Sequence, residues 1–137
     1  MADYNAFEDT AVTQAVTYIL NKRTQISKFY SMNLPSEILL PKLKKNHFST
    51  NYLYMIKHQK RDKLKRVLEL NKIETKIETP ILIPHQSYYK NKKFKIDLIN
   101  AKKIHKRLLS LPIHEKLKTN ELKKIVKIVN KFNAKNS

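Results

Sequence analysis

Histidine, lysine and tyrosine are the residues of this 137-residue sequence whose side chains could do chemistry. Five histidines are present, but no two of them fall four residues apart on one predicted helix. His47 and His58 also lack carboxylate neighbours at the spacing that metal ligands need. Cysteine is absent, which excludes a disulfide framework and thiol chemistry. We therefore predict no zinc site and no other metal site.

Lysine dominates the charge: it supplies 25 of the 29 basic residues, and the net charge is +18. A surface built to bind phosphate usually also enriches arginine, whose planar guanidinium contacts phosphate at two points. Here arginine occurs only four times, while Lys, Asn and Ile are abundant, as an AT-rich genome would favour. We interpret the excess mainly as drift of surface residues to lysine. Weak, salt-sensitive and non-specific nucleic-acid binding would follow from the charge alone.

Two further compositional features narrow the class of function. Glycine is absent, which excludes the glycine-rich phosphate loops of nucleotide-binding proteins. A base-stacking surface needs exposed aromatic rings beside basic residues. Only Tyr88 and Tyr89, next to Lys90, Lys92 and Lys93, fit that pattern, and the other tyrosines stand at positions typical of a core.

The first residues and the hydropathy of the sequence indicate where in the cell the protein is expected. Residues 1–5 are acidic and contain no apolar segment, so a signal peptide is not expected. No apolar run approaches the roughly 18 residues that a membrane span requires. We expect a soluble, cytoplasmic protein that does not bind membranes.

Apolar spacing predicts the elements that would position these residues. One long helix is expected over residues 5–31, ended by the Asn33-Leu34-Pro35 segment. Alternating aromatic and apolar residues predict a strand over residues 51–57. A helix should follow from Arg61 to Asn71, and then a half-buried strand over residues 72–77.

The second half of the chain is predicted to contain a loop and two helices. The loop covers residues 79–95, and a helix capped by Asp97 should present Ala101, Ile104 and Leu108 on one face. The last helix is expected from its cap at Thr119 to about Phe132, with residues 133–137 as a loose tail. Residues 1–137 are thus predicted to form a single α+β domain, with a small antiparallel sheet covered by helices.

Three segments resemble the C-terminal part of the DegT/StrS-type nucleotide-sugar aminotransferases. They are Lys22-Arg23 with Ile26 and Tyr30, the Arg61-Asp62-Lys63-Leu64 helix start, and the Leu108-Leu109-Ser110-Leu111-Pro112-Ile113-His114 turn before the last helix. The resemblance implies the C-terminal domain of the aspartate-aminotransferase fold, also called fold type I. It also implies a pyridoxal-phosphate enzyme that transfers an amino group from glutamate to a keto-sugar nucleotide in surface polysaccharide biosynthesis.

The segment from Thr75 to Tyr89 resembles the family loop that contacts the nucleotide-sugar. Thr75, Pro80, Gln86 and Tyr89 match that loop, whereas Glu78 and Thr79 stand in place of its His-Tyr pair. His85 lies one residue after the second family histidine, and Lys72 stands where the family has glycine. The resemblance implies that His85, Gln86 and Tyr89 are substrate contacts, with a solvated loop histidine as the alternative for His85.

The catalytic lysine of the family lies upstream of everything that this sequence matches. That lysine, and the carboxylate beside the pyridine nitrogen, belong to the large domain, and none of the 25 lysines here stands in a matching context. We therefore expect no catalytic residue, no bound cofactor and no transamination by the chain alone.

Three hypotheses about the role of the chain remain open. The first is a truncated or decayed family member. The second is one half of a split enzyme, which docks with a separately encoded large domain or forms a homo-oligomer. The third is a small basic protein that binds nucleic acid or another polyanion.

Overall fold

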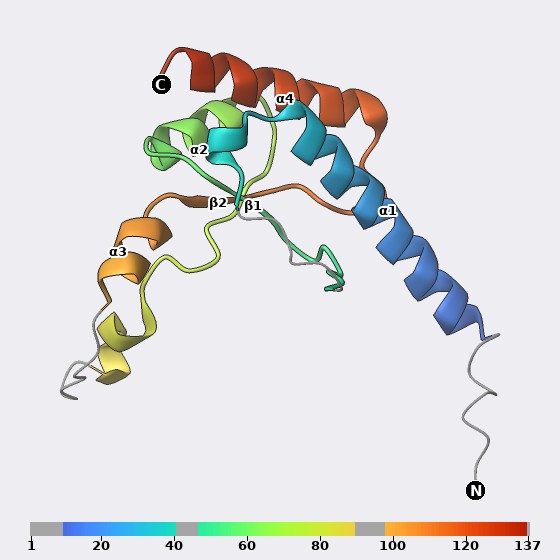
Figure 1. Ribbon diagram of the computed structural model, residues 1–137, viewed down its shortest axis with the longest axis horizontal. Helices are drawn as coiled ribbons and strands as arrows, with labels where there is room; N and C mark the ends of the chain where they lie inside the picture. The colour runs from blue at the N-terminus through green and yellow to red at the C-terminus, as the bar shows by residue number, and fades with distance from the viewer. Residues whose placement is uncertain (1–9, 41–46, 90–97, 137) are drawn as a thin grey trace, which may run out of the picture.

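The computed structural model describes residues 10–40, 47–89 and 98–136 (Figure 1). It contains an α-helix at each end of the described chain, two shorter helices and two strands between them. Three short 3-10 turns, over Ser36–Ile38, Ile83–His85 and Ser87–Tyr89, connect these elements. In chain order the helices and strands are α1 (Ala11–Asn33), β1 (Tyr54–Lys57), α2 (Arg61–Leu70), α3 (Ile99–His105), β2 (Leu108–Leu111) and α4 (Thr119–Ala134).

The sheet is small and antiparallel. β1 pairs with β2, and Ile56 lies opposite Leu109. Single bridges extend the sheet at both edges, from Leu39 to Ile56 and from Lys76 to Ser110. The α+β fold, with helices over an antiparallel sheet and a long first helix, is as predicted.

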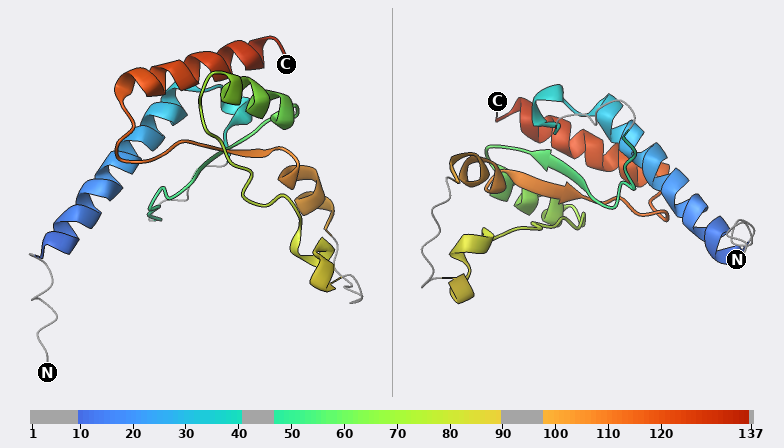
Figure 2. Two further views of the ribbon diagram at one scale, coloured as in Figure 1. Left: turned by 180° about the vertical axis from the view of Figure 1, so that it is seen from behind. Right: turned by 60° about the horizontal axis from the view of Figure 1, so that its bottom comes forward.

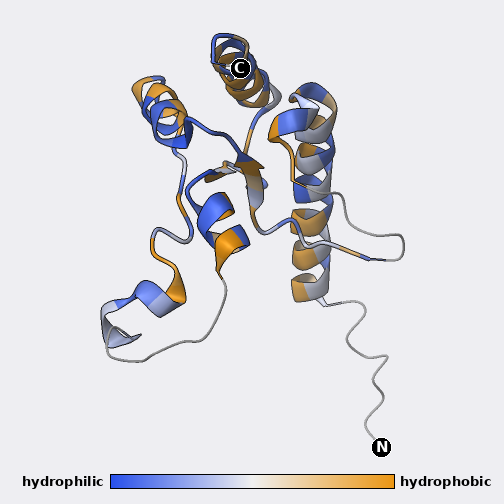
Figure 3. Ribbon diagram, turned by 60° about the vertical axis from the view of Figure 1, so that its left-hand side comes forward, coloured by the Kyte–Doolittle hydropathy of each residue, from blue (hydrophilic) through white to orange (hydrophobic). Residues whose placement is uncertain are grey.

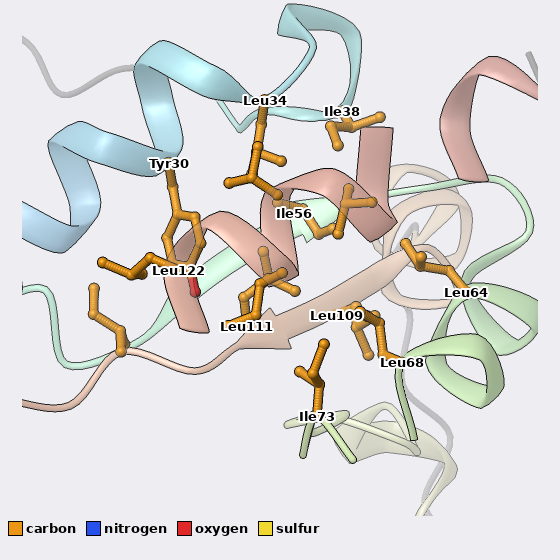
Figure 4. Packing of buried hydrophobic residues seen from close by; sticks show 14 of the residues in the cluster. Tyr30, Leu34, Ile38, Ile56, Leu64, Leu68, Ile73, Leu109, Leu111 and Leu122 are labelled. Atoms are coloured by element: carbon orange, nitrogen blue, oxygen red, sulfur yellow. The ribbon is translucent and has the colours of Figure 1, made fainter. Parts of the chain in front are cut away.

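The hydrophobic core lies between the sheet and the helices (Figure 4). Ile56 of β1 and Leu109 of β2 are fully buried, because their side chains point to the face that α2 and α4 cover. On α4, apolar residues three or four positions apart form the stripe that the sequence predicts. The helical residues of this core include Leu64 and Leu68 of α2 and Leu122, Ile125, Val126 and Val129 of α4.

The first helix begins later than predicted. Thr10 has an extended backbone, and its hydroxyl accepts a hydrogen bond from the Thr13 N–H at 3.3 Å. Threonine is a favourable N-cap because this bond satisfies a free N–H of the first turn. The prediction of one continuous helix from residue 5 is therefore wrong, although residues 5–9 themselves lie outside the described part. The helix ends at Asn33, before Pro35, as predicted.

Tyr30 ties α1 to the far end of β2. Its ring is fully buried and lies 4.8 Å from the ring of Tyr54, centroid to centroid. Its hydroxyl donates a hydrogen bond to the backbone carbonyl of Pro112 at 2.9 Å. Burial, with a smaller contribution from Tyr54, raises the pKa of Tyr30 well above its usual range. One side chain thus links segments 82 residues apart.

One prediction near the sheet is confirmed in part and another is wrong. Residues 72–77 alternate between exposed and buried as predicted, with Ile73 and Thr75 buried, but they make only one bridge, at Lys76, and so do not form a full strand. The chain leaves α2 through Lys72 in the left-handed conformation, with φ 60°. Leu108, predicted on a helix face with Ala101 and Ile104, begins β2 instead, and α3 ends at His105. A short, mostly apolar segment such as Leu108–Leu111 fits a strand as well as a helix end.

The last helix differs from the prediction at both ends. Lys118, not Thr119, is the N-cap residue, and its backbone N–H donates to the Glu121 carboxylate at 2.8 Å. A carboxylate in the first turn also suits the positive end of the helix dipole. α4 continues to Ala134, and Asn133 is buried.

We use the name body for the packed elements, which are the C-terminal half of α1, β1, α2, residues 72–78, β2 and α4. Two parts of the chain extend away from the body. The first is the N-terminal half of α1, and the second is the described part of residues 79–105, which we call the arm (Figures 1 and 2). Figure 3 shows hydrophobic residues along the outer half of α1. There Val12 is 71% exposed and Val16 is 49% exposed, so the predicted apolar stripe of α1 is buried only near Ile26 and Tyr30.

Candidate functional site

The three predicted substrate contacts lie together on the arm. His85 ends the turn Ile83–His85, Gln86 follows it, and Tyr89 ends the turn Ser87–Tyr89. The Tyr89 N–H donates to the Gln86 carbonyl at 2.9 Å, which holds the two turns in one compact unit. His85 and Gln86 are exposed and Tyr89 is half-buried. The cavities described below are lined by other residues.

Tyr88 and Tyr89 do not present two parallel rings to a partner. Their rings meet edge to face, with centroids 4.9 Å apart and an interplanar angle of 89°. Tyr88 is 74% exposed. Lys90, Lys92 and Lys93, which the base-stacking hypothesis needs beside the tyrosines, lie outside the described residues.

Arg61 fixes the point where the arm joins the body. It stands at the start of α2, with its side chain 11% exposed. Its Nη1 donates to the carbonyl of His105 at 3.4 Å and to the carbonyl of Leu108 at 3.2 Å. These two carbonyls flank the passage from α3 to β2, so one guanidinium connects three elements.

Glu78 lies directly before the other end of the arm, and it is an acidic residue in the segment that resembles the substrate loop. Lys76 neutralises it, since the Lys76 Nζ lies 3.0 Å from the Glu78 Oε2. The same contact raises the pKa of Lys76. Glu78 is therefore held in an ion pair within its own segment.

A cavity of about 460 Å³ lies where residues 72–78 meet β2 and the start of α4. Its apolar wall includes Ile73, Ile113 and Ile125. Thr75 and Ser110 also line it, and each is more than nine-tenths buried. Neither hydroxyl oxygen has a hydrogen-bond partner among the described residues. Sequence reasoning did not find this cavity, because Ser110 gives no polar signal of its own within an apolar run.

His58 is a buried histidine with a structural partner. Its Nδ1 accepts a hydrogen bond from the Lys60 N–H at 2.9 Å, directly before α2. Its ring meets Phe132 edge to face, with centroids 5.2 Å apart. Burial lowers the pKa of His58. The ring is part of a second cavity, which Glu37, Arg107 and Asn133 also line.

The described residues contain neither a cluster of metal ligands nor a helix that could span a membrane. Within residues 10–40, 47–89 and 98–136, no three His, Cys, Asp or Glu side chains lie close enough to hold a metal ion. In the same ranges, no helix combines the length and the apolar character that crossing a membrane requires.

The sequence of this chain matches a known protein family. The model of the DegT/DnrJ/EryC1/StrS aminotransferase family matches residues 10–130. The chain belongs to this family. Among curated proteins, none matches the chain in sequence.

Solved structures of this family have the same fold. A DegT DnrJ EryC1 StrS aminotransferase from Brucella abortus is 26% identical, with a TM-score of 0.76 over 83% of this chain and 31% of that chain. DesV from S. venezuelae, solved in complex with a ketimine intermediate, is 20% identical, with a TM-score of 0.80 over 88% and 34%. The PLP-form of the putative sugar aminotransferase Spr1654 from Streptococcus pneumoniae is 23% identical, with a TM-score of 0.74 over 87% and 32%. The chain thus spans about a third of the length of these aminotransferases.

The PLP-form of Spr1654 is named after pyridoxal phosphate. The described residues of this chain do not suit that cofactor. A Schiff base to pyridoxal phosphate needs an uncharged lysine amine, which proteins obtain by burying the lysine or placing it beside another cation. None of the lysines within the described ranges is buried. The Glu78 carboxylate raises the pKa of Lys76 and so keeps its amine charged, which is the opposite of what a Schiff base requires.

Proposed function

We propose that these 137 residues serve as the small domain of a sugar aminotransferase and do not transaminate by themselves. A large domain, on a separate chain or on a longer form of this one, would supply the lysine and pyridoxal phosphate. The complete enzyme would transfer an amino group from glutamate to a keto-sugar nucleotide for surface polysaccharide biosynthesis. This chain would provide support for the active site and contacts to the substrate.

One observation carries the first part of this proposal: the family match coexists with the absence of any buried lysine in the described residues. The fold is retained, since the chain superposes on a third of each relative with TM-scores above 0.7. Within the described residues, no lysine has the buried setting that the covalent chemistry requires.

We assign the substrate contacts to His85, Gln86 and Tyr89. The two 3-10 turns bring their polar groups together at one place on the arm. The exposed imidazole and amide are free to donate to the phosphate or sugar oxygens of a nucleotide-sugar. The arm also extends from the body (Figure 1), so these groups are accessible to a ligand that another domain holds.

The test compares the isolated chain with a chimera. In the chimera, this chain replaces the matching third of the Brucella abortus aminotransferase. Mixed with pyridoxal phosphate, glutamate and a keto-sugar nucleotide, the isolated chain should show neither the visible absorbance of a bound cofactor nor turnover. The chimera should show both. Cofactor absorbance with turnover in the isolated chain, or an inactive chimera that folds and binds cofactor, contradicts the proposal.

The substrate contacts are tested in the same chimera. His85→Ala, Gln86→Ala and Tyr89→Phe should each raise KM for the nucleotide-sugar several-fold, because each removes a hydrogen-bonding group. Ser87→Ala, between them on the same turn, is the matched control and should leave KM unchanged. An unchanged KM in all three variants would show that the arm does not bind the substrate.

A second candidate function is polyanion binding by α4. Lys123, Lys127 and Lys131 are exposed and stand four residues apart, so they form one stripe on the side opposite the core. Replacing all three by glutamine should weaken single-stranded DNA binding and lower its salt dependence by about 0.7 per lysine. A matched triple change at Lys102 and Lys103 of α3 and at Lys106, its C-cap residue, controls for net charge. Sequence-preferring binding that survives about 200 mM salt would make this the primary function.

A further inference from the structure

The cavity beside residues 72–78 differs in charge from the rest of the chain. The sequence has 29 basic and 11 acidic residues, yet equal numbers of lysines and glutamates line this cavity. Three of the 11 acidic residues therefore lie at one place. The charged lining residues are Lys72, Lys76 and Lys124 and Glu74, Glu78 and Glu121. A lining without net charge favours a ligand without net charge, whereas the remaining surface favours anions.

Only two of these charged groups are available to a ligand. The other four already have partners: Lys76 pairs with Glu78, Lys124 donates to the Asn71 carbonyl, and Glu121 accepts from the Lys118 N–H. Lys72 and Glu74 are exposed, and their side chains have no ion pair or hydrogen bond within the described structure. The rim thus offers one free ammonium and one free carboxylate, two residues apart.

Below this rim, the cavity combines apolar walls with two buried hydroxyls. Ile73, Ile113 and Ile125 are each at least nine-tenths buried and would pack against an apolar group. The hydroxyls of Thr75 and Ser110 have no hydrogen-bond partner among the residues described. Leaving such a group unpaired destabilises the folded chain. Serine and threonine side chains have staggered rotamers, so a turn about the Cα–Cβ bond can present the oxygen to a ligand.

We infer that this cavity binds a small zwitterion with an apolar body, as in an α-amino acid with an apolar side chain. The ligand carboxylate pairs with Lys72 and its ammonium with Glu74. The Thr75 and Ser110 hydroxyls, which both donate and accept, complete the polar contacts. The apolar side chain fills the space beside Ile73 and Ile113. This site lies on the body, apart from the substrate contacts proposed on the arm.

The first test measures ligand charge, using the complete 137-residue chain and L-leucine as the probe. Calorimetric titration should give leucine an affinity at least about tenfold higher than 4-methylpentanoate or 3-methylbutylamine, which each lack one of its two charges. Glutamate should also bind at least about tenfold more weakly, because its second carboxylate enters an apolar space. No binding of leucine, or equal affinity for leucine and its two analogues, overturns the proposal.

The second test separates binding from folding. Lys72→Gln and Glu74→Gln should each weaken leucine binding about tenfold, while Lys103→Gln on α3 should leave it unchanged. Thr75→Val should stabilise the free chain against urea, because it removes an unpaired buried hydroxyl, and should weaken leucine binding. Opposite changes in stability and affinity cannot come from misfolding. Unchanged affinity in all three site variants overturns the proposal.

Discussion

The body and the arm contain the same kinds of apolar residue but treat them in opposite ways. In the body, Ile56 and Leu109 are 0% exposed, whereas on the arm Ile83 is 61% exposed and Tyr88 is 74% exposed. Composition therefore does not distinguish the two regions, and the difference lies in what covers each residue. The sheet and the helix faces packed on it bury their apolar side chains, whereas the arm and the outer half of α1 leave several of theirs exposed. Met32 and Leu70, on the packed parts of α1 and α2, are exposed as well.

The largest effect expected from this comparison is on Leu109. Leu109→Ala should lower the free energy of unfolding by about 2–5 kcal/mol, because it leaves a cavity in the middle of the core. Ile83→Ala on the arm is the matched change and should alter stability by less than about 0.5 kcal/mol. Urea denaturation of both variants measures the contrast. Equal losses would show that the arm is covered by its own chain.

The next largest effect on stability is expected where the arm joins the body. Arg61→Met should cost about 2 kcal/mol, because it removes a charged donor from the carbonyls of His105 and Leu108. Hydrogen exchange should rise most in α3, since its attachment to α2 is lost. Arg66→Met, on the exposed side of the same helix, is the control. Unchanged exchange in α3 would contradict an anchoring role for Arg61.

A smaller effect is expected where the body stores backbone strain. Lys72 has φ 60°, a conformation that costs a residue with a Cβ about 1 kcal/mol or more. Lys72→Gly should therefore stabilise the chain by up to about 1 kcal/mol, measured by thermal unfolding. Lys63→Gly inside α2 should do the reverse. Destabilisation by Lys72→Gly would show that the lysine side chain contributes more than its backbone costs.

The smallest expected effect is the contribution of His58 to the pH dependence of the chain's stability. Burial lowers its pKa in the folded chain, so the unfolded chain binds a proton more readily. The stability from neutral His58 is fully present above the unfolded pKa of about 6.5 and is lost as the pH falls toward the folded pKa. Protonation would also make Nδ1 a donor facing the Lys60 N–H.

Urea midpoints between about pH 7.5 and pH 5.5 measure this loss. His58→Asn keeps an acceptor for Lys60 but cannot titrate, so it should reduce the slope. A slope that His58→Asn does not change would assign the pH dependence to other groups.

The sequence predicted the parts of the fold that local chemistry determines. Pro35 ends α1, Asn71 caps the end of α2, and the spacing of apolar residues in α4 matches its buried face. It failed where distant residues decide. Leu108 joins a strand rather than a helix because β1 offers a partner, and only the fold can supply that partner.

The candidate sites differ in the same way. The loop with His85, Gln86 and Tyr89 is continuous in sequence, so a motif could indicate it. The cavity depends on Thr75 and Ser110, which are 35 positions apart in the printed sequence and meet only through the bridge from Lys76. No spacing rule in one sequence brings such residues together.

The buried phenol of Tyr30 also gives the chain an optical probe. Tryptophan is absent, so tyrosine dominates the near-ultraviolet spectrum. Because Tyr30 is enclosed and donates to Pro112, it should resist ionisation in alkali until α1 separates from β2. A spectrophotometric titration would then register that separation as a late, cooperative step, without any label added to the protein.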